Sequence, residues 1–144
     1  MLDKSTIAIY DYVYNLLFGV VTENVYLMFE PEELLDTDVQ DGFVVVSVGD
    51  VHDESEFNSQ AYGWARVFVE AYVPTKSRGR LDETKYAAFE NGINEVIEQA
   101  TEQDKGAYFI VEDSVVSSSR KEQNNMNNQF MVFMKSFIVN IDKE

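Results

Sequence analysis

The chain has 144 residues, 45% of them hydrophobic, with 10 Phe and 8 Tyr, so it can bury the core of one domain and is not expected to be disordered. Its 26 acidic residues outnumber 11 basic ones and give a net charge of -15, which argues against specific binding to nucleic acid phosphates. The absence of cysteine excludes disulfides, thiolate zinc sites and cysteine nucleophiles, and fits a reducing cytoplasm. We therefore expect a single acidic domain spanning residues 1–144.

The N-terminal segment predicts an apolar helix from Ser5 to Phe18, with Ser5 as the N-cap and Gly19 just past the helix end. Charged residues interrupt the segment, and it lacks both the basic start and the cleavage site of a secretory signal. No uncharged run reaches the roughly 18 apolar residues that a membrane span needs. We expect neither signal-directed secretion nor a membrane partner.

The next segments predict two short strands separated by acidic loops. Residues 24–29 (NVYLMF) form the first candidate strand, which Pro31 closes because it cannot donate to a strand ladder. Residues 34–40 are acidic and predict a loop, and the β-branched run 43–48 (FVVVSV) predicts the second strand. Residues 49–60 are polar and acidic, which predicts an exposed loop between strands.

The strand predicted over residues 61–73 carries two different faces. One face is small and β-branched, as suits a helix packed closely against it, while the other mixes aromatic and charged side chains. Trp, Tyr and Arg are enriched at the energetic centres of interfaces, which makes this second face a candidate oligomer interface. The alternative is a second small core beneath the N-terminal helix or the C-terminal tract. The candidate interface residues are Trp64, Arg66, Phe68 and Tyr72, with Tyr62 and Glu70 beside them.

The loop over residues 75–80 holds the densest basic cluster, Lys76, Arg78 and Arg80. It could meet an acidic patch on a neighbouring copy or contact a phosphate backbone, and the alternative is a solubilising loop tip. A single basic cluster in so acidic a chain favours pairing with protein over nucleic acid. We therefore add these three residues to the candidate oligomer interface.

The C-terminal half predicts an amphipathic helix followed by a hairpin. The helix spans residues 82–102, with Asp82 as the N-cap, and the strands span about 107–117 and 129–141. The tract between them, residues 118–128, is polar and longer than a tight turn. The expected fold is α+β: a mainly antiparallel sheet of four to five strands with two helices packed on one face. The expected order is helix, three strands, helix, two strands.

No motif for catalysis stands out. His52 is the only histidine and lies in an acidic run, so a conventional histidine metal site cannot be completed. The segment Asp36–Gly42 resembles a calcium loop, yet the positions that require glycine and glutamate hold Asp41 and Ser47. Phosphate-binding glycine loops and a nucleophile elbow are absent from the sequence. We expect no enzyme, no cofactor and no metal.

Element order and lengths resemble the tail terminator, or tail completion, proteins of long-tailed bacteriophages. The resemblance is architectural and covers nearly the whole chain, without a short diagnostic motif. The segments that carry it are VYLMFEPEELL, WARVFVEAYVP, KYAAFENGINEVIEQA, VEDSVVSSS and FMVFMKSFIVNI.

The resemblance implies a homo-oligomeric ring, commonly a hexamer, that caps the tail tube and joins it to head-completion proteins. It implies acidic residues around a lumen through which DNA passes, with loops 49–60 and 118–128 against neighbouring copies or the tube. It implies no catalytic residues, and a location in the virion or the bacterial cytoplasm during assembly. Two alternatives from other classes are a cytoplasmic α+β module that binds a small ligand or regulatory protein, and a hydrolase using carboxylates.

Overall fold

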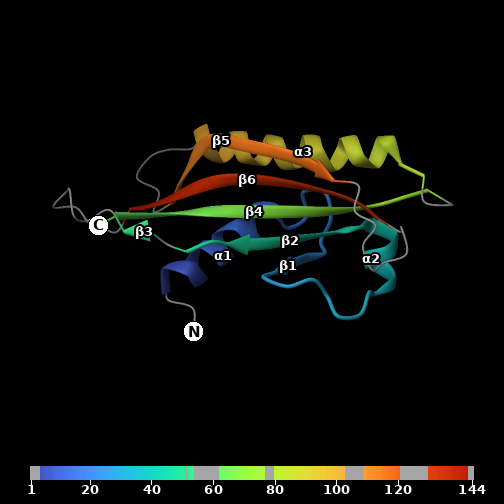
Figure 1. The fold of residues 1–144 in the computed structure, drawn as a ribbon, viewed down its shortest axis with the longest axis horizontal. Helices are drawn as coiled ribbons and strands as arrows, with labels where there is room; N and C mark the ends of the chain where they lie inside the picture. The colour runs from blue at the N-terminus through green and yellow to red at the C-terminus, as the bar shows by residue number, and fades with distance from the viewer. Residues whose placement is uncertain are drawn as a thin grey trace.

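A computed structural model describes the backbone of residues 4–50, 52–53, 62–76, 80–102, 109–120 and 130–142 (Figure 1). Side chains are described over residues 6–50, 64–76, 80–100 and 130–140. The expected α+β class is confirmed. The elements in chain order are α1 (Lys4–Leu17), β1 (Val25–Leu27), α2 (Asp36–Asp41), β2 (Phe43–Val48), β3 (His52–Asp53), β4 (Tyr62–Pro74), α3 (Glu83–Glu102), β5 (Phe109–Arg120) and β6 (Phe130–Asp142).

The sheet is built around β4 and β6, which pair antiparallel over their full lengths, from Tyr62 opposite Asp142 to Pro74 opposite Phe130. The strand order is β1-β2-β4-β6-β5, and β3 pairs with β4 outside this path. All pairings are antiparallel except that of β1 with β2, which is parallel because the chain passes through α2 between them. The sheet is therefore mixed at one edge and antiparallel elsewhere.

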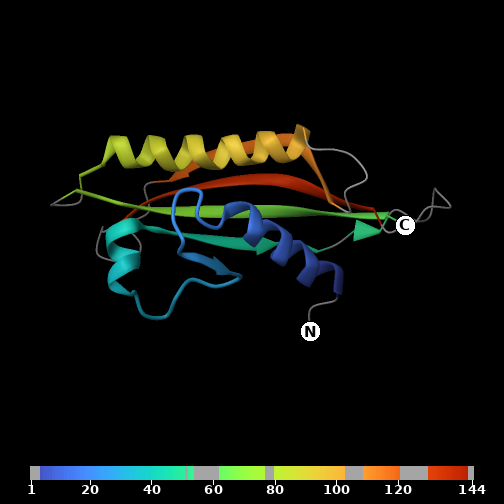
Figure 2. The same ribbon diagram turned by 180° about the vertical axis from the view of Figure 1, so that it is seen from behind.

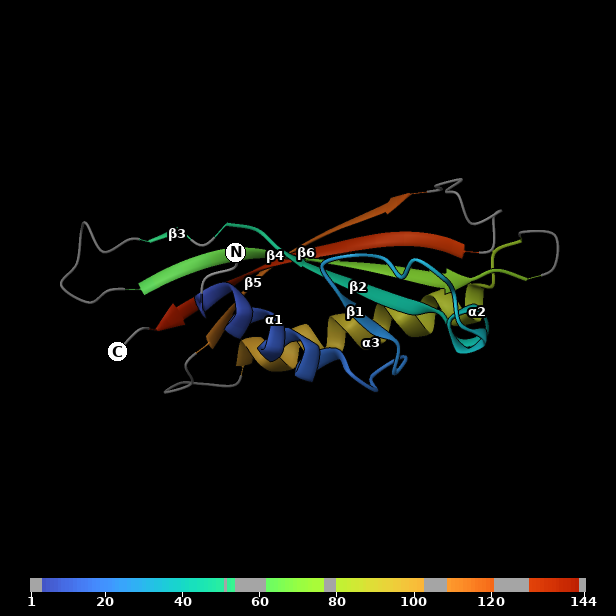
Figure 3. The same ribbon diagram turned by 90° about the horizontal axis from the view of Figure 1, so that it is seen from below.

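Helices α1 and α3 cover the same face of the sheet (Figures 2 and 3). The apolar side of α3 presents Phe89, Ile93 and Ile97, and α1 contributes Ile9 and Val13. Small and β-branched strand residues let the helix axes approach the sheet closely, and such close packing supplies most of the stability of a domain this size. The β4 side chains beneath the helices are all fully buried: Ala65, Val67, Val69, Ala71 and Val73.

The opposite face holds a second, smaller core at one end. Phe43 stacks on Tyr72 with ring centroids 4.4 Å apart, and Phe130 meets Phe43 edge-on at 5.3 Å. Val45 and Val132 complete the buried set, against which Tyr26 and Leu34 pack from β1 and the segment after it. Offset stacked and edge-to-face rings are the favoured aromatic geometries, so this end of the face is closed by packing.

Three predicted boundaries need correction. The acidic stretch 34–40, expected to be a loop, contains the short helix α2, whose first turn is held by Asp38. Helix α1 begins at Lys4, so Ser5 lies inside its first turn instead of capping it. Strand β5 runs on to Arg120, so the polar tract begins three residues later than expected, and residues 121–129 lie outside the described part. Asp82 does cap α3, since its Oδ1 accepts a hydrogen bond from the Lys85 amide at 3.1 Å.

The expected loop 49–60 also differs from the structure. His52 and Asp53 form the two-residue strand β3 opposite Trp64 and Gly63, and the other residues from 51 to 61 lie outside the described part. Over the described residues, helices are too short or too polar to cross a membrane.

Gly42 joins α2 to β2 in a conformation that only glycine adopts readily, with φ 80° and ψ 177°. A Cβ built there lies 2.5 Å from the Tyr72 carbonyl oxygen and 2.9 Å from Phe89 Cζ. We expect Gly42→Ala to lower the free energy of unfolding by about 3 kcal/mol, since backbone strain and overpacking add. Urea denaturation followed by circular dichroism measures the change.

Gly19 is the matched control. Its φ of 78° is similar, but a Cβ there meets nothing within 4 Å. Gly19→Ala is expected to carry only the conformational penalty, about 1 kcal/mol. Equal losses at both positions would show that the crowding around Gly42 does not matter.

Candidate functional site

The predicted interface residues Trp64, Arg66 and Phe68 lie half-buried on the face of β4 opposite α1 and α3. In Figure 1 this face is seen directly, with the strands in front of the helices. Neither ring belongs to the two buried cores. We call this region the open sheet face and define it by eight residues of two paired strands: Trp64, Arg66, Phe68 and Glu70 of β4, and Met134, Ser136, Ile138 and Asn140 of β6.

Tyr72, the fourth predicted interface residue, belongs instead to the small second core. Its side chain is 2% exposed and stacks on Phe43. The phenol hydroxyl also donates a hydrogen bond to the carboxylate of Glu30, which ties the segment after β1 to the sheet. The aromatic stripe therefore divides in two: Tyr72 is core, while Trp64 and Phe68 stand on the open sheet face. The side chain of Tyr62 lies outside the described part.

The open sheet face combines large apolar groups with a balanced pair of charges. Arg66 and Glu70 are the charged residues among its eight members, and the Arg66 Nη1 atom lies 3.5 Å from Ser136 Oγ. The side chains of this face are partly buried, except that of Ser136, which is 6% exposed. An apolar floor of rings beside one cation and one anion has the composition of a protein interface, because cores exclude such charges and exposed surfaces carry fewer rings.

The predicted basic cluster lies at the turn between β4 and α3. Lys76 and Arg80 are both exposed and face each other across an isolated bridge, in which the Lys76 amide donates to the Arg80 carbonyl at 2.7 Å. Arg78 lies outside the described part. Leu81, which follows directly, is 38% exposed. The turn thus presents two cations next to an aliphatic side chain.

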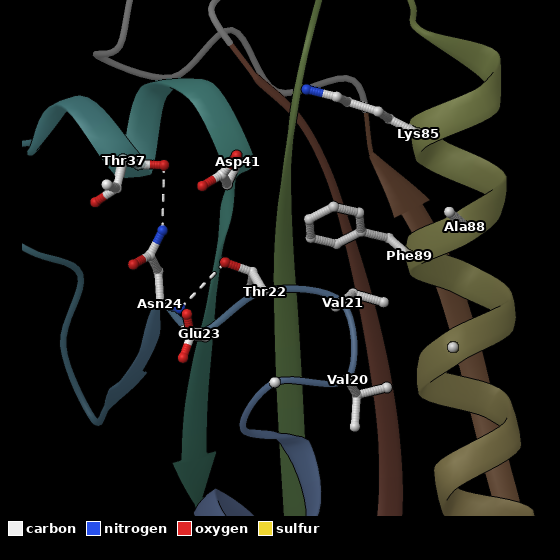
Figure 4. A pocket seen from close by; sticks show the side chains of 12 residues that line it. Val20, Val21, Thr22, Glu23, Asn24, Thr37, Asp41, Lys85, Ala88 and Phe89 are labelled. Carbon is white, nitrogen blue, oxygen red and sulfur yellow. Dashed lines mark hydrogen bonds between the residues drawn. The ribbon is translucent and has the colours of Figure 1, made fainter.

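A pocket of about 580 Å³ opens on the helix side of the molecule, between the turn after α1, the end of α2 and the first half of α3 (Figure 4). Its wall carries one amine, Lys85, and two carboxylates, Glu23 and Asp41. The remaining lining residues are Gly19, Val20, Val21, Thr22, Asn24, Thr37, Ala88, Phe89 and Gly92.

Several of the polar side chains that line this pocket form hydrogen bonds that hold the fold together. The Asn24 amide donates to the carbonyls of Thr37 at 3.2 Å and Gly42 at 3.1 Å, and Thr22 Oγ1 donates to Gly42 at 3.2 Å. Lys85 Nζ donates to the Gln40 carbonyl at 2.8 Å. These hydrogen bonds hold the turn after α1 against α2. The polar groups of the pocket wall that form them therefore have a structural role.

Metal-binding candidates do not gather in the described part of the chain, where groups of three or more His, Asp or Glu side chains are not found. The backbone of His52 lies in β3, and its side chain is outside the described part. The segment that resembled a calcium loop is the helix α2, in which Asp38 is fully buried and turned inward.

The buried Asp38 carboxylate is satisfied by two donors. The Tyr26 hydroxyl lies 2.8 Å from both of its oxygens, and the Leu35 amide donates to Oδ2 at 2.9 Å. Partial burial, followed by the hydrogen bond and the negative charge of Asp38, raises the pKa of Tyr26 from 10.0 to about 12. The pair fixes α2 at the end of the sheet, which is a structural role.

This pair predicts a change of stability at high pH. Because the folded protein favours the neutral Tyr26 phenol, its contribution is complete below pH 10 and is lost as the pH rises toward about 12. Tyr26→Phe removes a donor from a buried carboxylate, and we expect a loss of about 1–3 kcal/mol at pH 7. The difference between the two proteins in urea unfolding should shrink above pH 10. A difference that stays constant over that range would contradict the assignment.

One apolar surface escaped prediction from the sequence. Ile7 of α1 and Leu27 and Phe29 at the end of β1 are exposed large hydrophobic residues around a pocket of about 270 Å³. The sequence did carry a signal, because residues 25–29 are five apolar residues in a row. Side chains alternate between the two faces of a strand, so a short edge strand such as β1 does not bury all of them. At least some of these side chains had to face outward.

Comparison of the sequence with protein-family models gives no match, and comparison with curated proteins gives none either.

Proposed function

We propose that this protein is a structural assembly component that works as a homo-oligomeric ring, in the manner of a phage tail terminator. Its open sheet face is the surface that another copy covers. The ring caps a tail tube, joins it to head-completion proteins, and takes its place in the virion after assembly in the bacterial cytoplasm. The architectural resemblance supports this reading, and the open sheet face is the observation that carries it.

Contact between water and the apolar side chains of the open sheet face has a free-energy cost. Burying apolar area contributes about 25 cal/mol per Å², and a Trp or Phe offers some of the largest such areas of any side chain. Trp64 and Phe68 of β4 and Met134 and Ile138 of β6 share one face of two adjacent strands, where Arg66 and Ser136 lie between them. A partner that covers these four side chains buries the apolar area that the fold leaves exposed on them.

The distribution of charge permits a second copy as the occupant. The chain carries a net charge of -15, so two copies repel each other over most approaches. On the open sheet face the charges of Arg66 and Glu70 balance, which makes it a surface where like copies meet with little repulsion. Elsewhere the acidic excess suits a surface that faces DNA without binding it, as the lumen of such a ring does.

Trp64→Ala and Phe68→Ala test the proposal. Central aromatic residues of interfaces contribute about 2 kcal/mol or more to binding, so we expect each change to weaken self-association at least about thirtyfold. The melting temperature should be reduced less than association is, because both side chains lie outside the buried cores. Size-exclusion chromatography with light scattering over a range of concentrations measures the association.

Tyr72→Ala is the matched control from the same strand. It empties a buried position and should lower the free energy of unfolding by about 3–5 kcal/mol. At temperatures where this variant remains folded, its association should stay close to that of the unaltered protein. Loss of stability and association in equal measure at Trp64 and Phe68 would place them in the core. A protein that stays monomeric at every concentration, alone and with tube subunits, would overturn the ring altogether.

A small-ligand binding module is the second candidate, and the 580 Å³ pocket is the observation that favours it. Ala88→Trp separates the two functions, since Ala88 is exposed on the pocket wall and away from the open sheet face. The ring proposal expects unchanged self-association in this variant. A binding module would instead remain monomeric or dimeric, both with Ala88→Trp in the pocket and with the substitutions of Trp64 or Phe68 on the open sheet face.

A further inference from the structure

The larger pocket, between the turn after α1, the end of α2 and the first half of α3, is lined by residues that the structure describes (Figure 4). We call it the α2–α3 pocket. Its volume of about 580 Å³ lies within the range of about 300–1,000 Å³ that is usual for small-molecule sites. Its polar side chains fall into two sets, one that forms hydrogen bonds within the protein and one that does not.

The wall of the pocket is held by contacts within the protein. The side chains of Thr22 and Asn24 donate hydrogen bonds to the Gly42 carbonyl at 3.2 Å and 3.1 Å. On the α3 side, a Cβ built on Gly92 would lie only 2.6 Å from Val21 Cγ1, so the turn packs closely against the helix. A wall that is already ordered loses little conformational entropy when a ligand binds.

Two carboxylates of the wall belong to the second set. Glu23 lies in the turn after α1 and Asp41 at the end of α2, and both are exposed. Among the described residues, contacts that engage either carboxylate are not found. The amine of the wall, on Lys85, donates to the Gln40 carbonyl at 2.8 Å. The wall therefore carries two negative charges and one positive charge, and its carboxylates are open to a ligand.

This balance of charge favours a cation as the ligand. An anion would approach two carboxylates and one amine, and the net charge of -15 on the chain adds repulsion at longer range. A cation is attracted by both, and its hydrogen bonds to a carboxylate are stronger than those of a neutral donor.

The apolar part of the lining favours an organic cation over a metal ion. Val20 is 38% exposed, Val21 is partly buried and Ala88 is exposed, so these side chains offer hydrocarbon surface to a ligand. A hydrocarbon body gains free energy when it is buried against them. Calcium takes about six to eight oxygen ligands, whereas groups of three or more metal-binding side chains are not found in the described part of the chain.

We propose that the α2–α3 pocket binds a small organic cation, a protonated amine or guanidine carried on an apolar body. Glu23 and Asp41 contact the charged group, and Val20, Val21 and Ala88 contact the hydrocarbon. The inference goes beyond the ring and does not depend on it, because the pocket lies on the helix side of the molecule and the open sheet face on the other side. It names the ligand class that a binding module would take.

Four probes of similar shape separate charge from hydrophobic contact. Phenethylamine and phenethylguanidine are cations at neutral pH, phenethyl alcohol is neutral, and phenylpropionate is an anion. We expect at least one of the two cations to bind about tenfold more tightly than the alcohol, and the anion to bind more weakly than both. Isothermal titration calorimetry on the full chain measures the dissociation constants.

Variants of the wall locate the bound cation. Asp41→Asn and Glu23→Gln each remove one charge and keep the shape of the side chain, so each should weaken cation binding about fivefold and change alcohol binding less than about twofold. Ala88→Trp fills the pocket and should abolish the binding of both. Asp11→Asn is the matched control, because it removes an exposed carboxylate that does not line this pocket, and it should change neither affinity more than about twofold. Circular dichroism checks that each variant is folded.

The outcomes separate this site from the ring. Cation binding that is unchanged in Asp41→Asn, Glu23→Gln and Ala88→Trp would place the ligand elsewhere on the acidic surface and overturn the inference. Equal affinity for the cations and the alcohol, tighter binding of phenylpropionate, or no binding of either cation would overturn it as well. Self-association, followed by light scattering, should be unchanged in the same variants. Failure of the ring therefore leaves the cation site standing, and failure of the cation site leaves the ring.

Discussion

The structure depends on the alternation of side chains along β4, the central strand. One side must be small and apolar so that α1 and α3 can pack closely, and this side is completely buried. Because neighbouring residues on a strand point to opposite faces, every helix-facing residue places its neighbour on the other side. Two helices thus close one face of the sheet, and among the described side chains the other face is closed at the end where Phe43, Tyr72 and Phe130 pack together. The remaining area on β4 and β6 is the open sheet face.

The acidic composition restricts which surfaces of two copies can meet. A net charge of -15 opposes self-association in general, so any contact between copies has to be made where charge is balanced or complementary. The open sheet face meets the first of these conditions, because Arg66 and Glu70 carry opposite charges.

The long strands and helices could be predicted from the sequence because the patterns that mark them are local. Period-two alternation marked β4, period-3.6 spacing and Asp82 marked α3, and the α+β class followed from their order. The helix α2 could not be predicted in this way. Its acidic composition is typical of a loop, and the buried Asp38 is stabilised by Tyr26, which is distant in the sequence. Tyr72 could not be separated from Trp64 and Phe68 for the same reason: all three share one face of a strand, and only the pairing with Phe43 and Phe130 closes one end of it. The exposed pocket lined by Ile7, Leu27 and Phe29 could not be predicted, because it depends on the positive φ of Met28, which a sequence pattern does not encode.

The central claim, that another polypeptide covers the open sheet face, can be tested on a single side chain, since Trp64 is the only tryptophan of the chain. Its fluorescence emission and its quenching by acrylamide can be followed as the protein is concentrated, alongside the molar mass. The account predicts a shift to shorter wavelength and protection from the quencher that rise together with the molar mass. Trp64 emission and quenching that remain those of the dilute monomer while larger species form would contradict it.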